Sequence, residues 1–187
     1  MIQTGKLGDI RRVDIKAHFP QWPRSWQQNH WISTREQGGF IREVVPHFLQ
    51  LVNRLFGPLG EVVSCVEYPD DPEACETGII ACLQILADRN IQVLLNGLSQ
   101  AAVQEEASLT IYGTLGRVKL NNWRNLLFGK EGEELAEVPL QQTDHLFELI
   151  DHVVNAIQGR DNDIITFYEG VEIQKTLESL LTAATYR

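Results

Sequence analysis

Glu43 and His47 stand four residues apart in the stretch GGFIREVVPHFLQLVNRLFGPLG, residues 38–60. On a helix, residues at this spacing lie side by side on one face. A carboxylate next to an imidazole raises the basicity of the imidazole and fixes its orientation, so His47 could give or take a proton near neutral pH. An exposed surface pair without a chemical role has the same spacing, and spacing alone does not separate the two interpretations.

Other catalytic patterns are weaker. His145, Glu148 and His152 have a spacing that zinc could use, but they lie opposite Leu146 and Ile150 on the same helical stretch, so we expect a solvent-facing surface and no metal. The sequence has no Gly-x-Ser-x-Gly nucleophile motif, and none of its 14 glycines forms a Gly-x-Gly triplet. The residues therefore predict neither a serine nucleophile nor a phosphate-binding loop.

The stretch that carries Glu43 and His47 is predicted to be an amphipathic helix. Its apolar residues recur at helical spacing, and Gly57-Pro58 is typical of a helix end. Pro46 would remove one hydrogen bond inside the helix, so the regular helix either starts near Val45 or bends there. The apolar positions are Ile41, Val44, Val45, Phe48, Val52, Leu55 and Phe56.

The rest of the chain predicts an α+β fold, an open and mostly antiparallel β-sheet with helices packed on one face, in a single domain over residues 1–187. Apolar and polar residues alternate over 12–19, and further strands are expected at 61–68, 77–86 and 91–96, with a hairpin at 108–120. Residues 129–142 are expected to form a surface loop or short ribbon. Two helices follow, one at 144–158 with Leu146, Ile150, Val153 and Ile157 facing inward, and one at 167–184 that begins with a Thr166–Glu169 capping box.

Strand 77–86 is apolar on both of its sides, with Ile79 on one and Ile80 on the other. A second apolar sheet face needs a cover, so we expect a homo-oligomer, most simply a dimer through the sheet. The alternative is that loops of the same chain fold over that face.

The net charge, the apolar runs and the cysteines of the chain limit the kinds of partner and compartment that we expect. The formal net charge is −9 and the pI about 5.0, so phosphate backbones should repel the chain and nucleic acid is not expected as a partner. No apolar run has the length of a membrane helix, and the N-terminus has no signal-peptide pattern. Three cysteines without a Cys-x-x-Cys pair are typical of reduced thiols, and we expect a cytoplasmic protein without a membrane.

Four segments in order carry a resemblance to a known family. They are GKLGDIRRV from Gly5, GGFIREVVPHFLQLVNRLFGPLGEV from Gly38, LTIYGTLGRVKLNNW from Leu109, and YEGVEIQKTLESLLTAA from Tyr168 to Ala184. Together they resemble the C-terminal half of the Gfo/Idh/MocA family of NAD(P)-dependent oxidoreductases.

This resemblance implies a two-domain enzyme in which a Rossmann domain binds NAD or NADP and carries a Glu-Lys-Pro catalytic lysine. The second domain supplies substrate contacts and forms oligomers through its sheet. None of the five lysines of this chain precedes a proline, and Gly-x-Gly is missing. We therefore expect the cofactor-binding half to be absent from this chain and the chain itself to bind no cofactor.

The family pattern also marks candidate site residues. Gly38 and Gly39 match, and His47 matches the histidine that lies beside the substrate in relatives, while Glu43 replaces the usual aspartate. Two positions depart from the pattern, since Val45 replaces a small residue and Gln50 replaces a second aspartate. The resemblance implies His47 and Glu43 as catalytic residues and Arg24, Trp26, Trp31 and Gln50 as substrate contacts.

Three functions follow as hypotheses. The first is the substrate-binding and oligomerisation domain of an oxidoreductase acting on a small sugar- or polyol-like molecule, inactive without its Rossmann partner. The second is a stand-alone binding or scaffold protein derived from that domain. The third is an independent hydrolase or lyase that uses Glu43 and His47 without nicotinamide.

Overall fold

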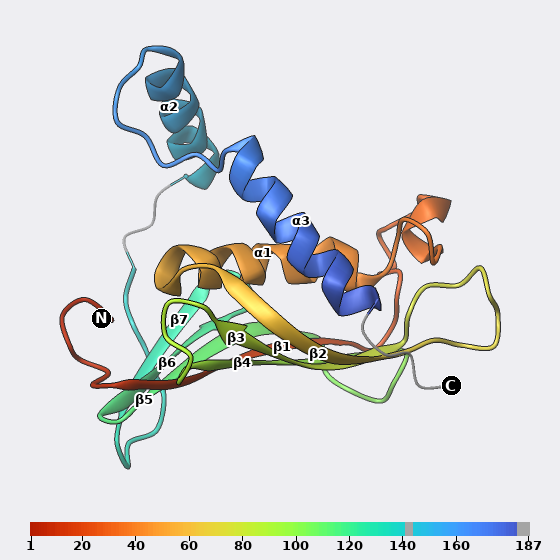
Figure 1. The fold of residues 1–187 in the computed structure, drawn as a ribbon, viewed down its shortest axis with the longest axis horizontal. Coiled ribbons are helices and arrows are strands. Elements are labelled where there is room, and N and C mark those ends of the chain that lie inside the picture. The colour runs from red at the N-terminus through yellow and green to blue at the C-terminus, as the bar shows by residue number, and fades with distance from the viewer. Residues whose placement is uncertain (141–143, 183–187) are drawn as a thin grey trace.

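A computed structural model describes residues 1–140 and 144–182, apart from the side chains of residues 61 and 62. One large sheet carries helices on a single face, which confirms the predicted α+β fold class (Figure 1). The strands are β1 (Ile10–Phe19), β2 (Leu59–Glu67), β3 (Gly78–Ile85), β4 (Gln92–Ser99), β5 (Glu106–Gly113), β6 (Gly116–Asn121), β7 (Asn125–Lys130) and β8 (Ala136–Glu137). The helices are the 3-10 helix η1 (His30–Ser33) and the α-helices α1 (Phe40–Phe56), α2 (His145–Ile157) and α3 (Phe167–Thr182).

The first strand lies in the middle of the sheet. The strand order is β2-β3-β4-β1-β5-β6-β7-β8, and β1 pairs with β4 in parallel, whereas every other neighbouring pair is antiparallel. The alternation predicted for β1 is confirmed, because Val13, Ile15, Ala17 and Phe19 are all buried beneath the helices. The sequence did not predict β7, which adds an antiparallel strand just before the acidic segment.

Helix α1 packs its apolar stripe on the sheet and is continuous through Pro46. It begins at Phe40 because the first turn finds an acceptor in another part of the chain. The Ile41 N–H donates to a carboxylate oxygen of Glu76, just before β3, at 2.7 Å. First-turn amides have no partner within their own helix, so this contact fixes where α1 starts.

Helix α3 packs on α1 and β2. The predicted capping box is confirmed: the Glu169 N–H donates to the Thr166 hydroxyl at 3.2 Å, and the Thr166 N–H donates back to the Glu169 carboxylate at 2.8 Å. Further along, Arg42 of α1 forms an ion pair with Glu178. These contacts hold α3 across the outer surface of α1.

The inward packing predicted for helix α2 is wrong for this structure. Leu146, Ile150, Val153 and Ile157 remain exposed, with Leu146 at 66% and Ile157 at 81%. The thirteen residues of α2 are all described, and none is buried. Figure 1 shows α2 standing away from the sheet, beyond the start of α3. The amphipathic pattern of α2 is present, but no surface within residues 1–140 and 144–182 buries its apolar side chains.

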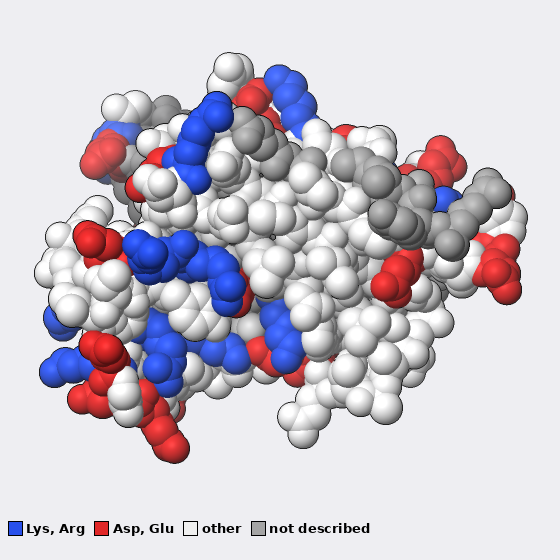
Figure 2. Space-filling model, turned by 60° about the horizontal axis from the view of Figure 1, so that its bottom comes forward, with Lys and Arg blue, Asp and Glu red and all other residues white. Residues whose placement is uncertain are grey.

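The outer face of the sheet is open. The two-sided apolar pattern of β3 is confirmed, since Ile79 is buried while Ile80 is 60% exposed on the other side. Figure 2 shows this outer face, with a broad uncharged area and charged side chains gathered mainly toward the left of the view. Among the described residues no loop covers Ile80, so the loop-cover alternative does not hold for this position. No helix in the described part of the chain is long and apolar enough to cross a membrane.

Candidate functional site

A pocket of about 440 Å³ opens beside the first half of α1. Three segments that are distant in the sequence form its walls: the loop after β1, helix α1, and the turn between β6 and β7. The pocket brings together four of the predicted site residues, His47, Glu43, Arg24 and Trp26. Its full lining is Arg24, Trp26, Gln27, Glu43, Val44, His47 and Trp123.

The α1 wall presents both ionisable candidates. Val44 is buried in the core and anchors this part of the helix, while Glu43 is half-buried and His47 is exposed beside the pocket. Among the ion pairs and hydrogen bonds of the described residues, none joins Glu43 to His47. The imidazole instead meets the indole ring of Trp123, at 5.6 Å between centroids and an interplanar angle of 84°. An aromatic edge contact of this kind orients the imidazole ring.

The sequence analysis missed three residues that line the pocket, Gln27, Val44 and Trp123. Of these, Trp123 contacts the candidate histidine. It lies in the turn between β6 and β7, where Asn122 and Trp123 both have positive φ, 46° and 67°. Asn122 ties the turn to β5, since its N–H donates to the Ala107 carbonyl and its side-chain oxygen accepts from the Ala107 N–H. The Trp123 ring stacks on Phe48 of α1 at 4.4 Å and 13°. The only sequence signal was an aromatic residue just after the predicted hairpin at 108–120.

Arg24 is held in place by aromatic rings and one acid. Its guanidinium lies over the rings of Phe19 at 4.5 Å, Trp22 at 5.2 Å and Trp26 at 5.8 Å. Its Nε donates to Glu105 at 2.9 Å. This anchoring holds the guanidinium, paired with Glu105, in the pocket wall that the loop after β1 forms.

Two predicted substrate contacts lie elsewhere. Trp31 sits exposed on η1 and does not line the pocket. Gln50 continues the stripe of α1 that carries Glu43 and His47, but the start of α3 covers the stripe at that point. The Gln50 amide is buried and donates to Glu169 at 3.4 Å. The pocket therefore uses only the first half of the stripe.

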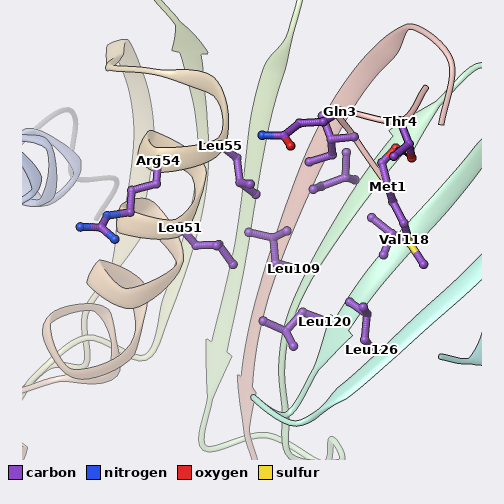
Figure 3. Close-up of a pocket in the computed structure, with 12 residues that line it drawn as sticks. Met1, Gln3, Thr4, Leu51, Arg54, Leu55, Leu109, Val118, Leu120 and Leu126 are labelled. Atoms are coloured by element: carbon purple, nitrogen blue, oxygen red, sulfur yellow. Dashed lines mark hydrogen bonds between the residues drawn. The ribbon is translucent and has the colours of Figure 1, made fainter. Parts of the chain in front are cut away.

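A second cavity, of about 490 Å³, lies between the second half of α1 and strands β5 to β7 (Figure 3). Leucines dominate the walls, among them Leu51, Leu109 and Leu120, and the residues before β1 close one side. Figure 3 shows the guanidinium of Arg54 turned away from this cavity, and that group bonds with Asp163 and Glu169. Few polar groups remain to orient a polar substrate there.

No group of three or more metal-ligating side chains lies together within residues 1–140 and 144–182. His145 and Glu148 are exposed neighbours on α2, and the ring of His152 accepts a hydrogen bond from the Asp163 N–H at 3.1 Å. His152 thus holds the loop after α2.

One buried acid lies behind the site. Glu76 is 2% exposed, and its burial raises the pKa of the carboxyl to about 7, although the hydrogen bond from Ile41 works in the opposite direction. Because Glu76 accepts from the first turn of α1, it supports the helix that presents Glu43 and His47.

A family model described as an oxidoreductase family, C-terminal alpha/beta domain, matches residues 1–186. The chain belongs to the Gfo/Idh/MocA oxidoreductase family. The predicted resemblance is thereby confirmed. A search of curated protein sequences gives no match.

Solved structures share the fold. The chain is similar to KijD10, a 3-ketoreductase from Actinomadura kijaniata in complex with NADP and TDP-benzene, with a TM-score of 0.76, 15% identity, and coverage of 100% of this chain and 58% of that one. It is also similar to the WlbA dehydrogenase from Bordetella pertussis in complex with NADH and UDP-GlcNAcA, with a TM-score of 0.71, 20% identity, and coverage of 98% and 55%. The chain therefore spans little more than half the length of these enzymes.

Proposed function

We propose that this chain is the substrate-binding and oligomerisation domain of an NAD(P)-dependent oxidoreductase that acts on a sugar- or polyol-like molecule. The observation that carries the proposal is the convergence of Glu43 and His47 with Arg24 in one pocket of about 440 Å³. An imidazole can exchange a proton with a hydroxyl or carbonyl oxygen at the reacting carbon, and a carboxylate can accept a hydrogen bond from a neighbouring hydroxyl. Arg24 suits an anionic group on the substrate.

The nicotinamide, NAD or NADP, would supply the hydride, and a separate nucleotide-binding domain would hold it. KijD10 and WlbA, both about twice as long as the matched region, were solved with NADP and NADH respectively. The exposed apolar side chains of α2 and of the start of α3 support such a partner domain, with Phe167 98% exposed. Without that domain no nicotinamide would be held against a substrate in the pocket, and we expect no turnover by this chain alone. A cytoplasmic location is part of this proposal, because Cys65, Cys75 and Cys82 are free thiols, which a reducing compartment favours.

A second copy of the chain is proposed to cover the outer face of the sheet. Ile80 and Val63 are exposed there, and Figure 2 shows a broad uncharged area on this face. A twofold pairing of two such faces would bury the same patch on both subunits.

The test is ligand binding by the purified chain, measured by calorimetry with UDP-glucose and with NADH. We expect UDP-glucose to bind, and His47→Ala to weaken binding about tenfold, by the loss of one hydrogen bond to a charged or polar partner. His30→Ala, which changes an exposed histidine on η1 outside the pocket, serves as the matched control.

NADH should not bind to the chain alone. Saturable NADH binding would overturn the half-enzyme proposal, because the chain would then hold its own cofactor. If His47→Ala leaves UDP-glucose binding unchanged, the ligand binds outside this pocket and the proposed site is wrong. A stand-alone binding protein would instead bind a ligand in the pocket and show no activity when mixed with a nucleotide-binding domain of the family.

A further inference from the structure

We infer that Trp123 is the stacking platform of the pocket, and that it selects a substrate in which the reacting sugar is a closed ring rather than an open-chain polyol. This inference rests on the proposed function of the pocket and adds a residue and a ligand shape to it. Three observations carry it: the backbone conformation of Trp123, the packing of its indole, and the groups beside it.

The backbone at Trp123 is in a conformation that large side chains avoid. Its φ is 67°, and Asn122 before it has a φ of 46°. Glycine, asparagine or aspartate is usual at such positions of a hairpin turn, because a Cβ crowds the backbone when φ is positive. A strained residue persists where the surrounding structure holds it, and such residues gather at ligand sites. A tryptophan at this turn therefore needs a reason beyond forming the turn.

The packing of the indole leaves part of its ring available. Phe48, which is fully buried, stacks on one face of the ring at 4.4 Å and 13°. Yet Trp123 is 43% exposed and lines the pocket. Phe48 covers one face and the His47 ring contacts the indole at 84°, so the exposed area is the part of the ring that these two side chains leave uncovered. Asn122 fixes the turn to β5, so the platform is rigid before any ligand arrives.

The chemistry around the platform fits a sugar ring. The face of an indole carries partial negative charge and attracts the slightly positive C–H groups on the flat side of a pyranose. Glu43 and His47 line the same pocket and can bond the hydroxyls at the ring edge. The His47 ring touches Trp123 at 5.6 Å, so a ring on the indole would bring its hydroxyls beside the imidazole. An open-chain polyol has no flat C–H face, and it would lose more conformational entropy on binding than a closed ring does.

The test is a nuclear magnetic resonance titration of the ¹⁵N-labelled chain, following its four tryptophan indole N–H signals and the side-chain amide of Gln27. The probes are UDP-glucose, UDP, methyl β-glucopyranoside and glucitol. We expect UDP-glucose and the glucoside to shift the Trp123 signal, and UDP and glucitol at equal concentration to leave it in place. Trp123→Gly should weaken UDP-glucose binding about tenfold, because one stacking contact is lost. Glycine is chosen because it adopts a positive φ without strain, so the turn should keep its conformation.

Two further variants separate stacking from folding. Trp123→Phe keeps a smaller ring and should retain part of the affinity. Leu115→Ala removes an exposed apolar side chain from the β5–β6 turn, at the opposite end of β6 from Trp123, and should leave UDP-glucose binding unchanged. Thermal melting of each variant shows whether it is folded.

The outcomes separate the inference from the proposed function. If UDP-glucose shifts the signals of Trp26 and Gln27 but not of Trp123, the pocket binds the ligand and the platform role is wrong. If UDP alone shifts Trp123 as strongly as UDP-glucose does, the ring that stacks is the base, and the inference is likewise overturned. If no probe shifts any pocket signal at millimolar concentration, the proposed function fails and the inference fails with it.

Discussion

Glu76 offers the sharpest test of how the fold supports the site. Its carboxylate is buried, accepts the Ile41 N–H at 2.7 Å, and presses against Gly39, where an added Cβ would lie 2.1 Å from the nearer carboxylate oxygen. Burial raises the pKa of Glu76 from 4.5 to about 7. The perturbation we choose is Glu76→Gln, which keeps the shape and the acceptor for Ile41 but removes the titration.

The sign of the effect follows from the two pKa values. Between pH 4.5 and about 7 the folded protein binds more protons at Glu76 than the unfolded chain does, so the free energy of unfolding falls as the pH rises through this window. One pKa unit corresponds to about 1.4 kcal/mol, so the step from 4.5 to about 7 amounts to about 3 kcal/mol. Most of it, about 2 to 3 kcal/mol, should fall between pH 5 and pH 8.

The assay is urea unfolding followed by tryptophan fluorescence at pH 5, 6, 7 and 8. The native protein should lose stability across this series relative to Glu76→Gln, and the difference between their free energies of unfolding should change by about 2 to 3 kcal/mol. Glu73→Gln, at an exposed glutamate three residues away, is the control and should follow the native protein. Equal pH slopes for native protein and Glu76→Gln would refute the reasoning, because the carboxylate would then titrate alike in the folded and unfolded states.

Three shorter predictions concern other contacts. Thr166→Ala breaks the capping box of α3 and should lower the free energy of unfolding by about 1 kcal/mol in urea titrations; no change would mean that the box does not stabilise the helix. Glu106 is partly buried, but hydrogen bonds led by Lys119 lower its pKa to about 2, so its stabilising effect is present above pH 4.5 and is lost as the pH falls toward 2. Glu106→Gln should therefore cost about 1 kcal/mol at pH 7, after allowance for solvent screening, and nothing at pH 2, as measured by thermal unfolding. Ile80→Arg should turn a dimer into a monomer in sedimentation experiments, and an unchanged sedimentation coefficient would rule out the outer sheet face as the interface.

The sequence by itself determined the features that depend on neighbours along the chain. The start of α3 follows from Thr166 and Glu169, whose side chains bond each other's backbone within one turn. The inward face of β1 follows from strict alternation, because successive side chains of a strand point to opposite sides. The α+β class follows from the order of these elements, and the position of Glu43 and His47 on one side of α1 follows from helical spacing.

Only the tertiary structure decided the contacts between distant segments. Glu76 supports the first turn of α1, which allows that helix to begin before Pro46, and no local pattern announces this contact. Helix α2 has an amphipathic sequence, but this periodicity predicts only that one face is apolar. It does not predict which surface packs against that face. Trp123 meets His47 because the turn between β6 and β7 is fixed beside α1 by the register of the sheet. The packing of the whole core sets the register of the strands and the way α1 crosses the sheet. The residues that face each other across the pocket therefore cannot be predicted from neighbours along the chain.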